Sequence, residues 1–371
     1  MPPPDDRLRA RLAAAQDLAT APDRDALLVT SPIHLRYLFG LDVSAGAALV
    51  RGGGTAVVAD QRYLDVFREV GGRLGVDVVA VPRGGAYETA IAALAAETGV
   101  RRMGIEADHL TVARRQALAE ALRATGAGAC VDTTGLLAGE RVLKDAWELG
   151  VLREAGRRLT EVAACILPKV SVGPTERQLA WEIDQALRNA GFDKPAFETI
   201  VASGPNAARP HHRPTGRPLA EGDLVVVDFG GLLDGYAVDM TRTVAIGRVP
   251  AEHLRWLRAV AAAQDAAIAS AAPGRLPSAV DEAARSTLAA EGLDGYFVHG
   301  TGHGLGLDVH ERPWIGPRGD ADGPLAAGMV FTVEPGVYVP PVGGVRIEDD
   351  VVVTPSGVER LTGVPPTCEI Q

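Results

Sequence analysis

The second half of the chain carries a weak internal repeat, in which an apolar run ends in an acid and a glycine. Residues 219–230 (LAEGDLVVVDFG) align with residues 325–336 (LAAGMVFTVEPG) at an offset of 106. Upstream of each copy, two glycines bracket a helical segment: Gly173 with Gly191, and Gly274 with Gly292. The repeat predicts two α–β halves, each a helical layer followed by a β-hairpin, that meet around a shared site.

The first copy continues into a hairpin that brings two acids together. The apolar run that ends at Asp228 is followed by glycines and by a second strand-like segment, residues 236–244, which contains Asp239. A turn near Leu233-Asp234, with a register that pairs Asp228 with Asp239, would place the two Cβ atoms roughly 5 Å apart on one face. Because like charges at that spacing destabilise a hairpin, a bound cation is expected there.

The second copy repeats this arrangement with two glutamates, and a glycine-rich stretch adds a histidine. Residues 329–334 end at Glu334 and lead through a turn rich in proline and glycine to Glu348. Five potential metal ligands result: Asp228, Asp239, His303, Glu334 and Glu348. Buried without metal, the acids would repel one another and several would have to take up protons. Their charge of about −4 balances two divalent cations, so the sequence predicts a site for two divalent metal ions per chain.

Five motifs surround these ligands: Pro210-His211, the DFG and GYAVDMTRT segments of 228–243, HGTGHGLGLDVHE at 299–311, EPGVY at 334–338 and GVRIEDD at 344–350. In combination they resemble the M24 metallopeptidase family, in its prolidase and Xaa-Pro aminopeptidase branch. The resemblance implies an α/β (α+β) chain of two domains. A creatinase/prolidase-like α/β domain, residues 1–140, would precede a pseudo-symmetric pita-bread metallopeptidase domain, residues 141–371.

The resemblance also implies a role for each metal ligand. Asp239 and Glu348 would bridge the two ions. Asp228 would bind one ion, while His303 and Glu334 would complete the coordination of the other. A water between the ions would become a nucleophile near neutral pH because the metals lower its pKa, with Glu334 as the proton shuttle. One imidazole among four carboxylates is an oxygen-rich ligand set that favours Mn²⁺, with Co²⁺, Fe²⁺ and Zn²⁺ left open.

Several further residues are implied to form the substrate cleft: His211, His299, His310 and Tyr338. His310 would donate toward the oxyanion, and His211 toward the leaving proline. Arg346, two residues before a bridging acid, would hold the metal carboxylates by charge-assisted hydrogen bonds. His212 adjoins His211 but does not fit the family pattern, so its part in the site is left open.

The expected substrate follows from the chemistry of proline. A bond to the proline nitrogen lacks an N–H, so a protease that grips that amide as a donor fails, whereas two Lewis acids acting on the carbonyl do not need it. A cation that also binds the free amino group would restrict cleavage to the N-terminus. The sequence predicts a proline-specific metalloexopeptidase, an Xaa-Pro aminopeptidase or Xaa-Pro dipeptidase (prolidase), acting on peptides with proline in second position. The preferred peptide length and the preferred residue before proline are left open.

Two other classes of protein remain as alternatives. A creatinase-like hydrolase would cleave a non-peptide C–N bond with this fold and without metal. A non-catalytic family member would only bind peptides. Relatives of both kinds lack part of the ligand set, whereas this chain has all five ligands. Methionine aminopeptidases share the ligands but usually lack a long N-terminal domain, so about 140 additional residues disfavour that reading.

Composition bears on the partners and the cellular setting. The formal net charge of −10 argues against nucleic acid, because a phosphate backbone calls for a basic surface. The three cysteines, Cys130, Cys165 and Cys368, are too few and too scattered for a disulfide framework. The first residues contain no apolar core of signal-peptide length, and no stretch is long enough to span a bilayer. We therefore expect a cytoplasmic protein without a membrane partner, and a homodimer.

Residues 1 to about 140 alternate between strand and helix patterns, which predicts a mixed sheet with covering helices. Strands are expected at 26–29, 47–50, 55–59, 76–81 and 104–106, and helices at 7–18, 87–97 and 111–124. The boundary is expected between Thr133 and Lys144, before a long helix at 147–167. Thr175 and Gln178 predict a capping box at the start of the helix after that.

Overall fold

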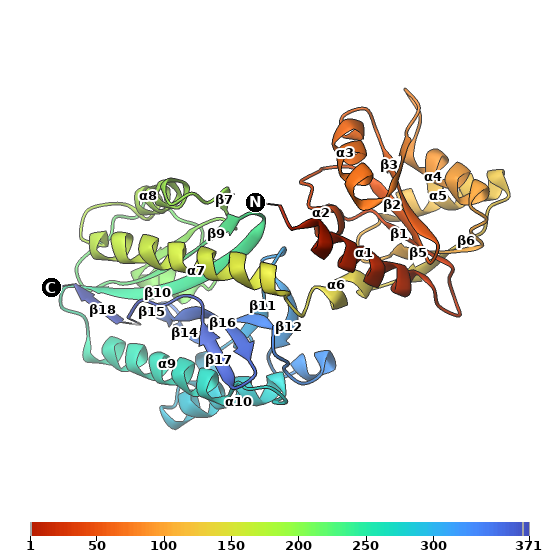
Figure 1. Ribbon diagram of the computed structural model, residues 1–371. Coiled ribbons are helices and arrows are strands. Elements are labelled where there is room, and N and C mark those ends of the chain that lie inside the picture. Colours follow the sequence, from red (N-terminus) through yellow and green to blue (C-terminus); the bar gives the residue numbers. More distant parts are fainter. Residues whose placement is uncertain (1, 366, 371) are drawn as a thin grey trace. The chain divides into compact units, whose positions relative to one another are not determined.

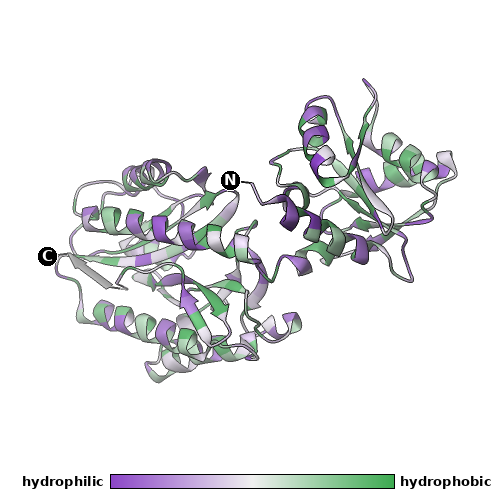
Figure 2. Ribbon diagram, in the orientation of Figure 1, coloured by the Kyte–Doolittle hydropathy of each residue, from purple (hydrophilic) through white to green (hydrophobic). Residues whose placement is uncertain are grey.

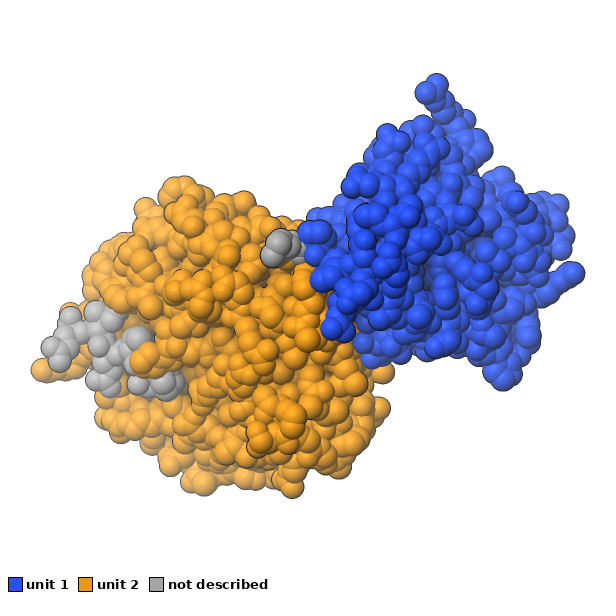
Figure 3. All heavy atoms as spheres, in the orientation of Figure 1, with its two compact units in different colours: residues 1–140 blue, residues 141–371 orange. Residues whose placement is uncertain are grey.

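The computed structural model describes residues 2–365 and 367–370 of the chain. They separate into two compact units, Met1–Glu140 and Arg141–Gln371 (Figure 3). Each unit has a hydrophobic core of its own. The central strands of both units carry mostly hydrophobic residues (Figure 2). Among the described residues, no helix combines the length and the apolarity that a bilayer span requires.

The N-terminal unit is a six-stranded mixed sheet with the order β4-β3-β2-β1-β5-β6. Its strands are β1 (Ala26–Val29), β2 (Ala47–Arg51), β3 (Gly54–Ala59), β4 (Asp77–Ala80), β5 (Arg102–Glu106) and β6 (Ala129–Thr133). Its helices are α1 (Asp5–Ala19), α2 (Pro32–Phe39), α3 (Leu64–Leu74), α4 (Tyr87–Glu97), α5 (Val112–Thr125) and α6 (Leu136–Glu140). The central strands are antiparallel and almost fully buried, whereas the outer pairs are parallel. All five expected strands and all three expected helices are present; β6, α2, α3 and α6 were not predicted.

The C-terminal unit is built on a ten-stranded sheet with the main order β12-β11-β13-β16-β10-β9-β7; β17, β18 and β8 pair with β16, β10 and β9. Its first strands are β7 (Lys194–Pro195), β8 (Ile200–Ser203), β9 (Leu224–Leu233) and β10 (Tyr236–Ile246). The later ones are β11 (Gly302–Gly304), β12 (Glu311–Ile315), β13 (Val330–Val333), β16 (Glu348–Thr354), β17 (Gly357–Arg360) and β18 (Thr367–Ile370). A separate ribbon pairs β14 (Gly336–Val339) with β15 (Gly343–Arg346).

Two pairs of helices lie on opposite sides of these strands (Figure 1). The helices are α7 (Ala146–Ile166), α8 (Glu176–Asn189), α9 (Ala251–Ser270) and α10 (Pro277–Ala290). One buried cluster joins α7 and α8 to β9 and β10, and a second joins α9 and α10 to β13 to β16. The chain therefore forms the two α–β halves that the repeat predicts. The bracketing glycines all adopt positive φ: Gly173 at 116°, Gly191 at 84°, Gly274 at 82° and Gly292 at 68°.

The first hairpin, β9–β10, turns one residue later than expected. Asp234 (φ 49°) and Gly235 (φ 83°) form its two-residue turn, as the mirror-image turns of tight hairpins require. Asp228 therefore pairs with Thr241 and Asp239 with Gly230, so the register that paired the two acids is wrong. The error equals two positions along one strand. Because side chains alternate between faces with a period of two, Asp228 and Asp239 still share a face as diagonal neighbours.

The second hairpin is interrupted where its acid lies. β13 pairs with β16, and β14 pairs with β15, in one continuous register. Between the two ladders, the backbone N–H of Glu334 donates to Thr301 O at 2.7 Å, and Pro335 has no N–H to give. The break in pairing leaves Glu334 next to β11 rather than within a regular ladder.

Candidate metal centre

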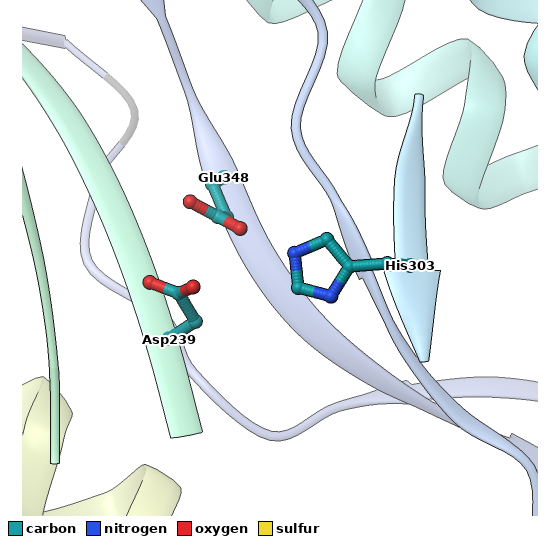
Figure 4. A group of neighbouring side chains, drawn as sticks. All are labelled: Asp239, His303 and Glu348. Atoms are coloured by element: carbon teal, nitrogen blue, oxygen red, sulfur yellow. The ribbon is translucent and has the colours of Figure 1, made fainter. Parts of the chain in front are cut away.

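The five predicted ligands come from separate strands and line one cavity of about 710 Å³. Asp228 lies on β9, Asp239 on β10, His303 on β11, Glu334 directly after β13 and Glu348 at the start of β16. Asp239, His303 and Glu348 each offer a ligand atom within 4.8 Å of the others, and Figure 4 shows the three side chains pointing toward one another. The same cavity is lined by His211, His212, His299, His310 and Arg346.

The alternation along β9 and β10 explains why the acids face this cavity. Val227 and Phe229 pack into the core formed with α7 and α8, so the intervening Asp228 faces the other side of the sheet. Val238 and Met240 do the same on either side of Asp239. Hydrophobic anchoring on one face therefore fixes the acids on the other.

Two carboxylate oxygens of the cluster are buried without a partner. Asp228 and Asp239 are 7 % and 6 % exposed, and the Oδ1 atom of each has no hydrogen-bond partner within the described part of the chain. Leaving a buried acceptor unpaired costs about 1–3 kcal/mol, and more for a charged group. Such oxygens are suited to bind cations, so the donor set fits divalent metal ions.

The electrostatics of these side chains also favour a bound cation. Burial, reinforced by Glu348 and Asp228, raises the pKa of Asp239 well above its usual value. Burial, with Glu334 and Asp228 beside it, likewise raises the pKa of Glu348. Burial also raises the pKa of Glu334 to about 8 and lowers that of His303 to about 4. Bound cations would stabilise the carboxylates, and a neutral imidazole is the form that ligates metal.

Three of the predicted ligands, Asp228, Glu348 and His303, are each held by a second group. The guanidinium of Arg346 donates through Nη2 to Asp228 Oδ2, and its Nε lies 3.2 Å from Thr241 Oγ1. Thr241 Oγ1 in turn donates to Glu348 Oε2 at 2.6 Å. His303 Nδ1 lies 3.1 Å from Gly304 O, which places the proton on Nδ1 and leaves the Nε2 lone pair free. These contacts orient the ligand atoms before any ion binds.

The contacts of the other two predicted ligands, Asp239 and Glu334, are less direct. The backbone N–H of Asp239 donates to Asp350 Oδ2 at 2.8 Å. Thr332 Oγ1 lies 3.5 Å from Glu334 Oε1, and His303 Nε2 lies at the same distance from that oxygen. Among the four acids, Glu334 is the one that is not fully buried. Its carboxylate therefore has access to the cavity.

Tyr338 connects two of the predicted cleft residues. Its hydroxyl lies 2.9 Å from His299 Nε2 and accepts from Arg346 Nη1 at 2.8 Å. The other ring nitrogen of His299 donates to Gly300 O at 2.8 Å. Burial raises the pKa of Tyr338 to about 12 and lowers that of His299 to about 4. Tyr338 is 4 % exposed and is not among the cavity-lining residues, so it supports the cleft from behind rather than facing it.

His310 and His211 lie on different loops that border the cavity. The His310 ring centroid is 4.3 Å from that of His303, and burial, with His211 nearby, lowers the pKa of His310. The next residue, Glu311, is ion-paired with Lys144 at 2.7 Å and with Arg141, which fixes the loop that carries His310. His211 is exposed to the cavity.

His212 is oriented differently from its neighbour. It is 6 % exposed, and its Nε2 lies 2.9 Å from Glu176 Oε2. Sequence reasoning missed Glu176, Thr241 and the pair of Arg141 and Lys144 as parts of the site's framework. Thr241 lies two residues after Asp239 in the same motif, so strand periodicity could have found it. Glu176 has no such signal, because its partners come from a distant segment.

Two equivalent α–β halves around a buried cluster of acids and one histidine define the pita-bread class of metal-dependent hydrolases. Residues 150–355 match the model of Metallopeptidase family M24, and residues 11–143 match that of the Creatinase/Prolidase N-terminal domain. The chain belongs to metallopeptidase family M24. Membership of this family implies divalent metal ions, which the fit of the residues supports.

Individual relatives carry more specific names. The chain is 34 % identical to the uncharacterized peptidase YqhT of Bacillus subtilis, over 92 % of this chain and 94 % of that protein. It is 36 % identical to an Xaa-Pro dipeptidase of Pyrococcus furiosus, over 60 % of this chain and 63 % of the relative. Among solved structures, an Xaa-Pro dipeptidase from Bacillus anthracis superposes with a TM-score of 0.91 at 31 % identity, covering 99 % of this chain and 100 % of that one.

Proposed function

We propose that this protein is a proline-specific metalloexopeptidase that hydrolyses the bond between an N-terminal residue and proline in dipeptides or short peptides. One observation carries the proposal: all five predicted ligands line one cavity, and two of them have a buried oxygen without a hydrogen-bond partner among the described residues. The Xaa-Pro dipeptidases among the relatives support the choice of substrate.

The residues that would hold two divalent ions are Asp228, Asp239, His303, Glu334 and Glu348. Mn²⁺ is the proposed metal because the ligand set is rich in oxygen. When bound, the ions would supply Lewis acidity and lower the pKa of a water at the scissile carbonyl.

The chain's own residues would handle protons and orientation. The leaving proline nitrogen has no hydrogen, so it must receive a proton as the bond breaks. Glu334 is the proposed carrier, because it is the least buried acid of the cluster and opens to the cavity. His310 would donate to the developing oxyanion, and His211 would contact the proline side. Arg346 would hold Asp228 in its coordinating orientation.

Three further proposals concern the domains of the chain, its assembly and its cellular compartment. We propose that residues 1–140 and 141–371 are separate domains, the second of which contains the catalytic groups. A cytoplasmic homodimer remains our proposal for the assembly. The thiols of Cys130 and Cys165 are free, which accords with a reducing compartment.

A substrate comparison tests the function. Ala-Pro and Ala-Pro-Ala should be cleaved after alanine in the presence of Mn²⁺, and the ratio of their rates would establish the preferred length. N-acetyl-Ala-Pro should not be cleaved, because the free amine is expected to bind a cation. Equal rates on acetylated and free Ala-Pro would refute the exopeptidase assignment. Hydrolysis of a non-peptide C–N substrate alone would favour the creatinase-like alternative.

A further inference from the structure

Glu176 is a fully buried acid outside the metal cluster that gathers an unusual number of hydrogen bonds. It is the first residue of α8 and is 0 % exposed. Its Oε1 accepts from Ser203 N at 2.9 Å, from Ser203 Oγ at 2.7 Å and from Asn206 Nδ2 at 2.9 Å. Its Oε2 accepts from Thr215 N at 3.0 Å and Thr215 Oγ1 at 2.7 Å, and lies 2.9 Å from His212 Nε2. One carboxylate thus ties α8 to both ends of the segment 203–215.

These contacts keep Glu176 ionised inside the protein. Burial alone would raise its pKa, but the hydrogen bonds from Asn206, Ser203, Thr215 and His212 outweigh burial and lower the pKa to about 2. A carboxylate can only accept, so the His212 ring nitrogen that faces it must carry a proton. The orientation of the His212 ring is thereby fixed.

The segment held in this way carries His211 to the cavity. On one side of His211, the imidazole of His212 is anchored on Glu176. On the other side, the carbonyl oxygen of Pro210 accepts from Arg346 Nη1 at 3.2 Å, and Arg346 also holds Asp228. The backbone of His211 is therefore fixed between two buried charged groups, one on α8 and one at the metal centre.

We propose that Glu176 and His212 form a positioning pair that sets His211 against the substrate. The inference rests on the proposed function, since it assigns the means by which one cleft residue is held. In this role His212 supplies a hydrogen-bond donor to Glu176 and takes no part in the chemistry. The positioning role accounts for His212, which borders the cavity although it is only 6 % exposed.

A pair of substitutions at His212 tests the donor role. His212→Gln places an amide N–H where the ring nitrogen lies, so its kcat/KM on Ala-Pro should stay within about threefold of wild type. His212→Met has a similar length and no donor, and its kcat/KM should fall about 10- to 100-fold, as for a lost hydrogen bond to a charged group. If His212→Gln loses as much as His212→Met, the imidazole itself is required and the positioning role is overturned.

A double-mutant cycle tests whether the pair acts through His211. Glu176→Gln turns amide hydrogens toward groups that must donate, so it should lower kcat/KM about 10- to 100-fold at full metal content. His211→Ala should also lower it. If Glu176 works through His211, the double variant should lose no more than His211→Ala alone. Losses that multiply, or a wild-type rate for either single variant, would contradict the proposal.

A matched control and a second readout separate positioning from general damage. Glu148 is another buried acid of this unit, 2 % exposed, that accepts from Tyr236 Oη at 2.9 Å and does not line the cavity. Glu148→Gln should leave kcat/KM per metal-loaded chain unchanged.

Hydrogen exchange of the Ser203 and Thr215 amides should become faster in Glu176→Gln and not in Glu148→Gln. Unchanged exchange in both variants would overturn the proposed positioning pair. Hydrogen exchange is measured without turnover. If the wild-type enzyme did not cleave Ala-Pro, the proposed function would be refuted, and the exchange result would still test the positioning pair.

Discussion

Each unit of the chain contains a buried acid, Glu106 in the first and Glu348 in the second, and the pKa values of the two acids shift in opposite directions. In the N-terminal unit Glu106 is 5 % exposed, accepts from the backbone N–H groups of Thr30 at 2.6 Å and Ser31 at 2.9 Å, and contacts the ring of His34. Burial alone would raise its pKa, but these partners lower it. In the C-terminal unit Glu348 is 2 % exposed, and neighbouring acids add to burial to raise its pKa.

Burial alone therefore does not distinguish a structural acid from a ligand. Glu106 has the protein's own donors around its carboxylate, and so does Glu176. The acids of the candidate metal centre lie close together, and the part of the chain that the structure describes offers no donor to one oxygen of Asp228 and one of Asp239. The charge that would satisfy them must come from outside the chain, which is what a metal site requires.

The largest expected effect is a difference in metal content between variants of Glu348 and of Glu106. Glu348→Ala should lose at least one metal ion and lower kcat/KM by about 10³-fold or more, because it removes a proposed bridging ligand. Elemental analysis and turnover of Ala-Pro measure both. Glu106→Gln should retain both ions and its activity.

Wild-type protein treated with a chelator should lose activity and regain it with Mn²⁺ or Co²⁺. Activity in a fully metal-free preparation would contradict the metal assignment.

The next effect distinguishes a ligand from a neighbour within the site. His310→Ala should keep its full metal content while turnover falls by roughly 10²–10³-fold, as for the loss of one preorganised donor. His303→Ala should lose metal and activity together. Metal depletion or full activity in His310→Ala would show that its proposed role is wrong.

A smaller effect concerns the stability of the metal-free protein. Glu106→Gln should lower the free energy of unfolding by about 1–3 kcal/mol, because an amide hydrogen then faces backbone donors. Glu348→Gln has the shape of the protonated acid, and it should leave the free energy of unfolding unchanged or raise it. Denaturant unfolding of both chelated variants provides the comparison. An equal loss in both would remove the distinction between the two acids.

The smallest effect is the pH dependence of that stability. The folded pKa of Glu334 is about 8, above its unfolded value, so its contribution is present below about pH 4.5 and is lost as pH rises toward 8. Glu106 has a lowered folded pKa, so its contribution is present above about pH 4.5 and is lost as pH falls. The unfolding midpoint of each chelated variant is compared with that of chelated wild type as a function of pH. The difference should change above about pH 4.5 for Glu334→Gln and below about pH 4.5 for Glu106→Gln. Metal-loaded protein should not show the loss at high pH.

Local pattern was sufficient to predict the elements that carry the site. The apolar runs before Asp228 and Glu334 predicted strands β9 and β13, and the repeat predicted the two halves that the structure contains. The hairpin register was missed because turn type decides it, and Asp234-Gly235 was the stronger turn signal than Leu233-Asp234. Strand β6 was missed because its residues are half exposed and lack a clear apolar pattern.

Long-range contacts explain what the sequence did not reveal. Nothing near Glu176 indicates that its partners lie 27 to 39 positions further along the chain. The ion pairs of Glu311 with Arg141 and Lys144 likewise join segments about 170 positions apart. Such contacts depend on tertiary packing between distant segments, so they become visible only in three dimensions.

The tight turn of the first hairpin has a consequence for changes in chain length. On β10, Val238 and Met240 face the helices while Asp239 faces the cavity, so odd and even positions have different environments. An insertion at Asp234-Gly235 that shifted the register of β10 by one residue would exchange the two sets, placing a carboxylate in the apolar core and a valine at the cavity. A shift of the register by two residues would keep both faces and only move the acid along the strand. The pairing register of β10 can therefore shift only in even steps if Asp239 is to stay on the cavity face.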